Sequence, residues 1–231
     1  RFTNMISALT LPFNVLSDLV YPNLCKSCGD MMTGSNLVCG TCLNKLRQTQ
    51  FGNWIKSMSC SEGIDAAFSC WFFDDELQQV IHLLKYSDYA GVGTQLGKLM
   101  GKTIQVDNIR EIDMLIPIPL HTVKKRKRGY NQADFIAKGL STSWNCPVRT
   151  DVLRRTKFTE SQTQLNKQER IQNLADAIVV RRNVKDKTIV LIDDVLTTGS
   201  TMSSAAIALK KCGTKKVIAL TCATPRPTEK T

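Results

Sequence analysis

The stretch that most constrains the fold of this chain is an apolar run that ends in two acids and a turn of hydroxyls and glycine. Ile189 to Ile192 are all apolar, which is typical of a strand buried on both faces of a parallel sheet. Asp193 and Asp194 end the run, and the small residues from Ser203 onward predict a helix. The sequence therefore predicts an α/β fold with a mainly parallel sheet flanked by helices.

The turn between this strand and helix has the composition of a phosphate site. Glycine lets the backbone approach a ligand closely, and free amides at a helix N-terminus attract anions. The expected phosphate-binding residues are Val195, Leu196, Thr197, Thr198, Gly199, Ser200 and Thr201. Carboxylates do not suit a phosphate, so Asp193 and Asp194 are expected to hold sugar hydroxyls, or a Mg2+ among hydroxyl and phosphate oxygens. A ribose 5-phosphate fits this pattern.

Four of the nine cysteines, Cys25, Cys28, Cys39 and Cys42, form a C-x2-C-x10-C-x2-C pattern. Two such knuckles supply four thiolates, which predicts a closed, structural Zn2+ site. The alternative is a pair of disulfides, which requires an oxidising compartment. Cys60, Cys70, Cys146, Cys212 and Cys222 stand mostly in apolar contexts and are expected in the core.

Positive charge is concentrated in one part of the chain. Residues 121–187 hold sixteen Lys and Arg against six Asp and Glu, which accounts for ten of the net charge of +11. The densest run, from Lys124 to Arg128, is expected in a loop after the apolar strand from Met114 to Leu120. Such a run is either a solvated face or a site for phosphate or nucleic acid.

A second basic stretch, from Leu153 to Arg170, is polar and has no strong period. It predicts a flap that closes over the site and excludes water, or else a disordered surface loop. The flap residues expected to act on a ligand are Arg154, Arg155, Lys157 and Gln162.

The 231 residues divide by pattern into four parts. These are an amphipathic helix over 1–22, a zinc finger over 23–46, a polar linker over 47–62 and the α/β domain over 63–231. The sequence contains no run of eighteen apolar residues, so no membrane span is predicted. The first twenty residues make a poor secretory signal, so a cytoplasmic location is expected, although position 1 is Arg and the true start could lie upstream.

The stretch from Val190 to Met202 resembles the phosphoribosyl pyrophosphate (PRPP) motif of type I phosphoribosyltransferases at every position. The whole chain is similar to the ComF (competence protein F) group, which joins a four-cysteine zinc finger to such a domain. The similarity rests on the knuckles, the PRPP motif and five further stretches: Ile81 to Tyr86, Pro117 to His121, Arg128 to Gln132, Leu153 to Arg155, and Ser161 and Gln162 with Arg170 and Asn173. It implies that Lys124, Lys125, Arg126, Lys127, Arg128 and Gly129 meet pyrophosphate. It also implies a role in the uptake of transforming DNA.

Two functions compete, and a third, a regulator of purine or pyrimidine genes that binds PRPP as an effector, lacks the support of a helix-turn-helix pattern. In the first, the protein transfers a 5-phosphoribosyl group from PRPP with Mg2+, using positioning and charge compensation and no nucleophilic side chain. In the second, it is a non-catalytic accessory protein of transformation that keeps the PRPP pocket and binds single-stranded DNA through its basic surface. The candidate acceptor contacts are Asp74, Asp75, Lys85 and Tyr86, and the sequence identifies neither the acceptor nor the oligomeric state.

Overall fold

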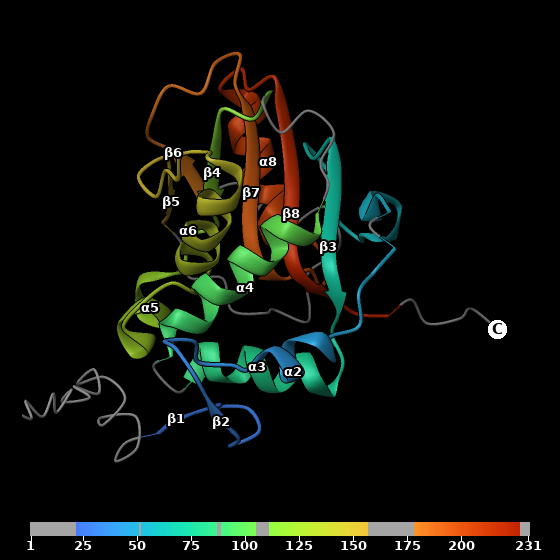
Figure 1. Ribbon diagram of the computed structural model, residues 1–231. Coiled ribbons are helices and arrows are strands. Elements are labelled where there is room, and N and C mark those ends of the chain that lie inside the picture. The colour runs from blue at the N-terminus through green and yellow to red at the C-terminus, as the bar shows by residue number, and fades with distance from the viewer. Residues whose placement is uncertain (1–21, 51, 87–88, 105–110, 157–177, 227–231) are drawn as a thin grey trace, which may run out of the picture.

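The computed structural model describes residues 22–50, 52–86, 89–104, 111–156 and 178–226. Its centre is a four-stranded, fully parallel sheet with the order β3-β8-β7-β4 (Figure 1). The strands are β3 (Ala66–Phe72), β4 (Met114–Pro117), β7 (Thr188–Val195) and β8 (Lys216–Thr224). The predicted α/β architecture with a parallel sheet is therefore confirmed.

Burial explains why these segments take these places in the sheet. The first five residues of β7 are buried, as the apolar run predicts for an interior strand covered on both faces. β4 is an edge strand and ends at Pro117, where the missing N–H costs no ladder hydrogen bond to a further strand.

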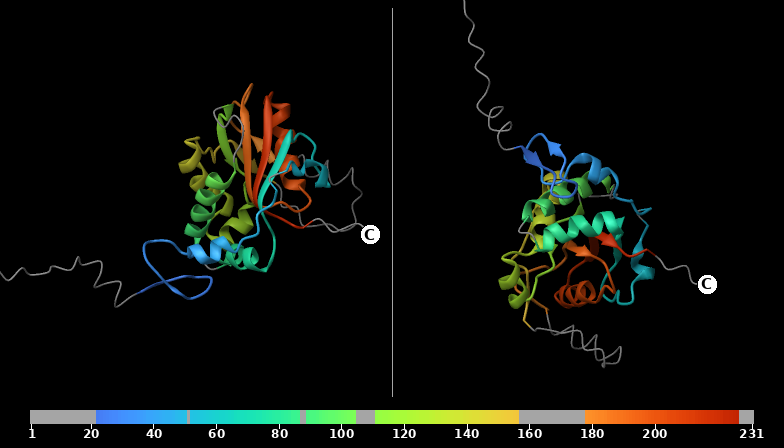
Figure 2. Two further views of the ribbon diagram at one scale, coloured as in Figure 1. Left: turned by 45° about the vertical axis from the view of Figure 1, so that its right-hand side comes forward. Right: turned by 90° about the horizontal axis from the view of Figure 1, so that it is seen from below.

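Helices cover both faces of the sheet (Figures 1 and 2). One face carries α4 (Ala90–Thr103) and α6 (Gln132–Trp144), and the other carries α8 (Ser200–Lys211). The apolar period of residues 76–86 and 92–104 correctly predicts α3 (Asp75–Tyr86) and α4. α3 lies across the end of the sheet at which the strands finish, so it forms a cap there.

Glycines let α4 and α6 cross with their backbones in contact. A Cβ at Gly97 would lie 2.0 Å from the carbonyl oxygen of Ile136, and one at Gly139 would lie 2.1 Å from that of Thr94. Only a residue without a side chain fits at either position, so these two glycines fix how the helix pair crosses.

The N-terminal cysteine region packs beside α3 and α4, at the cap end of the molecule (Figure 2). It consists of a hairpin, β1 (Asn23–Leu24) and β2 (Met31–Met32), followed by the short helix α2 (Gly40–Asn44). The amphipathic helix expected over residues 1–22 falls almost wholly outside the described residues. None of the helices in the described ranges is long and apolar enough to cross a membrane.

Three expectations about secondary structure need correction. The basic run is a helix, α5 (Thr122–Arg128), because Lys and Arg favour helices, His121 caps its start and Gly129 ends it with a φ of 81°. Residues Leu153–Arg155 form β5, which pairs antiparallel with β6 (Ile178–Val180), so the polar stretch begins as a strand. Residues 48–57 hydrogen-bond to β3 through Thr49 and Asn53 and include a 3-10 helix, Trp54–Ser57. The stretch expected to be a linker is thus packed on the edge of the sheet.

All nine cysteines are free thiols. Cys70, Cys146 and Cys222 are buried as expected, whereas Cys60 is half-buried and Cys212 is exposed. Cys212 lies outside the core because it follows the last residue of α8, where the chain turns toward β8.

Candidate functional site

Two carboxylates lie at the carboxyl end of β7. Asp193 and Asp194 belong to the strand, which continues to Val195 beyond the apolar run. The Nζ of Lys85, from the last turn of α3, lies 2.8 Å from Oδ2 of Asp194. The cap helix is therefore tied to the acidic pair by an ion pair between residues 109 positions apart in the chain.

The surroundings of Asp193 disfavour its charged form. Burial and the neighbouring charge of Asp194 raise the pKa of Asp193 to about 7, while Lys85 and Arg155 act in the opposite direction. Burial lowers the pKa of Arg155, and the charge of Asp193 opposes that shift. Lys85 and Arg155 thus flank the acidic pair, and the four side chains together carry little net charge. Such a pair suits hydroxyl groups as ligands.

The expected phosphate loop follows at once and ends in a helix N-terminus. Leu196 is buried and donates its N–H to the carbonyl of Ala223 on β8, which anchors the start of the loop. Thr197 and Thr198 are exposed, and α8 begins at Ser200, three residues earlier than the sequence indicates. The amides of the first turn of α8 and the hydroxyls around them can receive an anion.

Gly199 has a φ of 80°, and its conformation is held by a segment that the sequence analysis took for a linker. A Cβ at Gly199 would lie 2.3 Å from Cε of Met58 and 2.5 Å from the carbonyl oxygen of Cys60. The N–H of Cys60 donates to the carbonyl of Thr198 at 2.9 Å, and the hydroxyl of Ser203 donates to Glu62 at 3.0 Å. Residues 58–62 therefore form the floor of the loop. No local sequence pattern marks them for this role.

The basic helix α5 meets the cap on the same side. The guanidinium of Arg128 lies 5.4 Å from the ring centroid of Tyr86, the last residue of α3. The hydroxyl of Tyr130 donates to the carbonyl of Leu84. Lys124, Lys125, Arg126 and Lys127 are exposed, so Arg128 is the member of the run whose contact with the cap the structure defines.

The four residues expected in a flap do not lie together in the structure. Arg154 is exposed on β5, whereas Arg155 is half-buried beside Asp193. Lys157 and Gln162 lie outside the described residues. The structure thus brings Lys85, Arg155 and the acidic pair together, and Arg128 joins them through the end of α3. Lys85 was expected to contact the acceptor of the phosphoribosyl group, and in the structure it forms an ion pair with Asp194.

The four knuckle cysteines converge on one point. Their Sγ atoms all lie within 4.8 Å of one another, with Cys25 and Cys42 at 3.9 Å and Cys28 and Cys39 at 3.7 Å. A tetrahedral Zn2+ with Zn–S bonds of about 2.3 Å has sulfur atoms about 3.8 Å apart, which matches both distances. Burial opposes ionisation of Cys25, but hydrogen bonds from backbone amides outweigh it and lower the pKa of this thiol to about 6. The donor set fits zinc.

The cysteine region is docked firmly on the cap. The side chain of Gln95, on α4, accepts from the N–H groups of Leu37 and Val38 and donates to the carbonyl of Val38. Cys25, Val38, Cys42 and Leu46 belong to the same hydrophobic cluster as the buried residues of α3 and α4.

Comparison with known proteins gives one family match. The model of the phosphoribosyl transferase domain matches residues 103–230. The DNA utilization protein YhgH of Escherichia coli (strain K12) is 28% identical over 198 residues, which cover 84% of this chain and 81% of the relative. The competence protein F of Haemophilus influenzae is 26% identical over 200 residues, with the same two coverages. A solved structure of the allosteric regulatory enzyme of purine biosynthesis gives a TM-score of 0.43 at 16% identity, covering 62% of this chain and 30% of that one.

Proposed function

The chain belongs to the phosphoribosyl transferase domain family, and on that premise we propose that it binds PRPP at the carboxyl end of β7 with the zinc module as a structural part. The observation that carries the proposal is the junction of the acidic pair with the loop at the N-terminus of α8. In this proposal Asp193 and Asp194 bind the ribose hydroxyls, and residues 195–201 bind the 5-phosphate.

Lys85 and Arg155 support the ribose half of this assignment. Both cations compensate the carboxylates, so these can accept hydrogen bonds from hydroxyls without a metal ion of their own. Mg2+ then accompanies PRPP, where it neutralises charge on the pyrophosphate oxygens. The four knuckle cysteines hold Zn2+ with no open position, which makes that metal structural.

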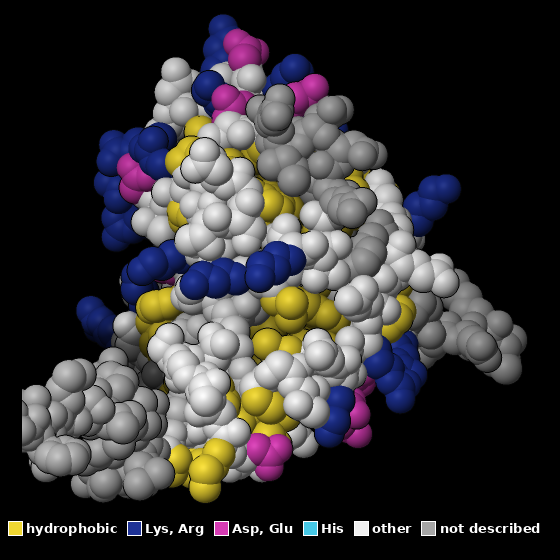
Figure 3. Space-filling model, viewed as in Figure 1, with side chains coloured by type: hydrophobic (Ala, Val, Ile, Leu, Met, Phe, Trp, Pro, Cys, Tyr) yellow, Lys and Arg dark blue, Asp and Glu magenta, His cyan; other side chains and the backbone are white. Residues whose placement is uncertain are grey.

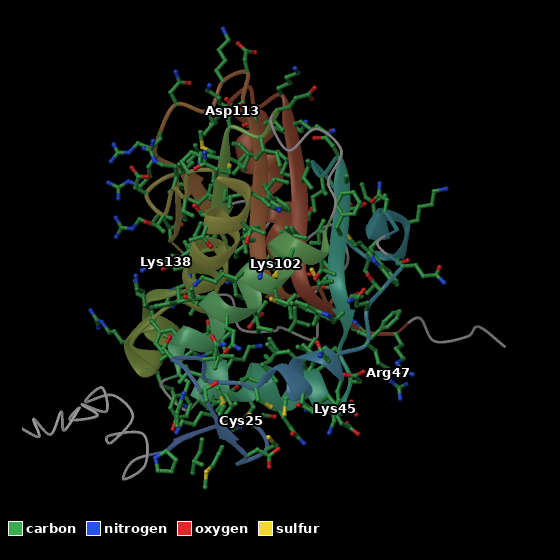
Figure 4. All side chains as sticks on the ribbon, in the orientation of Figure 1. Cys25, Lys45, Arg47, Lys102, Asp113 and Lys138 are labelled. Carbon is green, nitrogen blue, oxygen red and sulfur yellow. The ribbon has the colours of Figure 1, made fainter. Side chains whose placement is uncertain are left out.

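Titration of PRPP into wild-type protein and into the double variant Asp193→Asn, Asp194→Asn tests the binding site. We expect at least a tenfold loss of affinity in the variant, since each lost hydrogen bond to a charged group contributes about 1.5–3 kcal/mol. Asp113→Asn is the matched control, because Asp113 lies at the opposite end of the sheet (Figure 4). Equal affinity in the double variant and the control would refute the site.

Arg128 and its neighbours on α5 are proposed to meet the pyrophosphate. Replacing Arg126 and Arg128 with Ala should then weaken PRPP far more than ribose 5-phosphate, because only PRPP carries the group that they compensate. Paired titrations of the two ligands give the answer. Unchanged affinity for both ligands would show that α5 has no such role.

The transfer reaction itself is proposed to proceed by positioning and electrostatic stabilisation of an oxocarbenium-like state at the anomeric carbon. A panel of nucleobases and amines, incubated with PRPP and Mg2+, should reveal the acceptor by release of pyrophosphate. If none releases pyrophosphate while PRPP still binds, the second function is favoured, that of a non-catalytic DNA-binding protein of transformation. The two relatives are named for DNA utilization and for competence, which supports a role connected with DNA.

A further inference from the structure

A second basic surface lies on the helix pair α4 and α6, apart from α5. The two helices carry three lysines, Lys98, Lys102 and Lys138, and all three side chains are exposed. Their only acid is Asp134, which is half-buried and accepts a hydrogen bond from Asn131. Surface helices commonly carry both signs of charge, whereas the charged side chains that this helix pair exposes are all lysines.

The glycine crossing gathers these lysines on one narrow surface. Lys98 follows Gly97 and Lys138 precedes Gly139, the two residues at which the helix backbones touch. A Cβ on Gly139 would lie 2.9 Å from the backbone nitrogen of Lys98, so the two lysines start from adjoining points on the two helices. Lys102 stands one turn further along α4, about 6 Å away along the axis.

Nothing in the described part of the chain neutralises this lysine strip, by which we mean Lys98, Lys102 and Lys138. The six ion pairs found there, one of which joins Lys85 to Asp194, involve none of the three. A band of Lys and Arg side chains crosses the middle of this face with no acidic group within it (Figure 3). Lys102 and Lys138 are labelled on this face in Figure 4.

We propose that the lysine strip binds the phosphodiester backbone of a nucleic acid, independently of the PRPP site. Three cations in a row suit an extended polyanion better than a small phosphate, which needs donors converging on one point. A membrane surface would call for exposed apolar side chains beside the lysines. The exposed large hydrophobic residues of the described ranges all lie outside α4 and α6: Leu24, Met31, Tyr86, Val123 and Val179.

The same surface indicates what kind of binding to expect. Neither the strip nor the exposed residues beside it on the two helices include an aromatic ring on which a base could stack, since Phe135 packs edge-on against Tyr130. Contacts to phosphates alone carry no sequence information. The strip is therefore a surface for sequence-independent binding with strong salt dependence.

The test compares two triple variants that lose the same charge. The strip variant is Lys98→Gln, Lys102→Gln, Lys138→Gln. The control variant is Lys185→Gln, Lys211→Gln, Lys216→Gln. These three lysines are also exposed, and they lie around the turns at the end of the sheet opposite α3. Binding of a fluorescent 30-nucleotide oligodeoxythymidylate is measured from 50 to 300 mM salt. The strip variant should lose at least tenfold in affinity at the lowest salt concentration. Its log-log salt slope should flatten by about 2, because each lost phosphate contact removes about 0.7.

The control variant should stay within threefold of wild type, and saturating PRPP should displace no DNA from the wild type. An equal loss in both triple variants would mean that only net charge matters, and no loss in the strip variant would place DNA elsewhere. Either result overturns the proposal. Because all six lysines are exposed, both variants should keep the wild-type melting temperature and PRPP affinity. The DNA result therefore does not depend on whether PRPP binding is upheld.

Discussion

Asp193 shows at the scale of one residue how a buried carboxyl group can oppose stability. Its pKa of about 7 lies well above the usual value for an aspartate, because burial and Asp194 disfavour the charged form. Between the ordinary pKa and pH 7 the folded protein binds more protons at this group than the unfolded chain does. Stability is therefore lost as the pH rises through this window.

Asp193→Asn should for this reason increase the free energy of unfolding at pH 8 by about 1–3 kcal/mol, since Asn keeps the shape and never ionises. The gain should shrink toward zero near pH 4, where the aspartate is protonated in the folded protein. Urea denaturation of both proteins at the two pH values measures it. A variant that is less stable than wild type at pH 8 would show that the ionised carboxylate is favoured by its surroundings.

The residues that could be predicted from sequence are those that act with close neighbours in the chain. The acidic pair and the expected phosphate loop span nine consecutive residues, 193–201, and each cysteine knuckle spans four, so spacing alone singles them out as candidates. Lys85, Cys60 and Gln95 escape such an analysis because their partners, Asp194, Thr198 and Val38, lie far away in the chain. Only the fold brings each pair together.

At the scale of elements, periodicity explains both the successes and the failures. α3 and α4 bury one face, so their apolar residues recur at helical spacing and the sequence shows it. α5 buries no residue, and no apolar period distinguishes it from a loop. β5 and β6 have three residues each, which is too short for an alternating pattern to appear.

The crossing of α4 and α6 offers a test at this scale. Gly97→Ala should destabilise the protein by about 2–3 kcal/mol, because the new methyl group would meet the carbonyl of Ile136 at 2.0 Å. In a helix without that contact, the same change would stabilise by about 0.5–1 kcal/mol. Thermal denaturation measures the difference. Gly52→Ala is the control, since a Cβ there meets nothing within 4 Å.

At the scale of the whole molecule, the sequence suggests separate modules joined by a linker, whereas in the structure these parts pack together. The composition of residues 47–62 predicts a linker between two modules, yet these residues line β3 and brace the phosphate loop. The cysteine region shares its hydrophobic cluster with α3 and α4. Composition could not reveal this, because many of the hydrogen bonds that join the parts run through backbone groups, with Gln95 and Asn53 as side-chain partners.

Removal of zinc should accordingly affect the whole protein. If the four knuckle cysteines bind Zn2+ as proposed, a chelator should lower the melting temperature of the protein by about 5 °C or more, because the ion would stabilise a module that shares its hydrophobic cluster with α3 and α4. Differential scanning calorimetry with and without chelator measures this. Two separate transitions, of which only one responds to the chelator, would show that the module unfolds independently. A Cys28→Ser variant should melt at the same temperature as the chelated wild type.

The strand order β3-β8-β7-β4 has a consequence for how the protein is made. β3 emerges early from the ribosome, but its neighbour in the sheet is β8, and Ala66 pairs with Ile218. Until the last strand is synthesised, the edge of β3 that pairs with β8 has no partner and is open to other chains. The cysteine region and the cap can pack together before that point. Residues 58–62, the floor of the phosphate loop, can make their contacts only after β7 and α8 have been synthesised. The last residues to be translated thus close the sheet, and a chain released before Lys216 would keep the PRPP motif but lack the strand that joins it to β3.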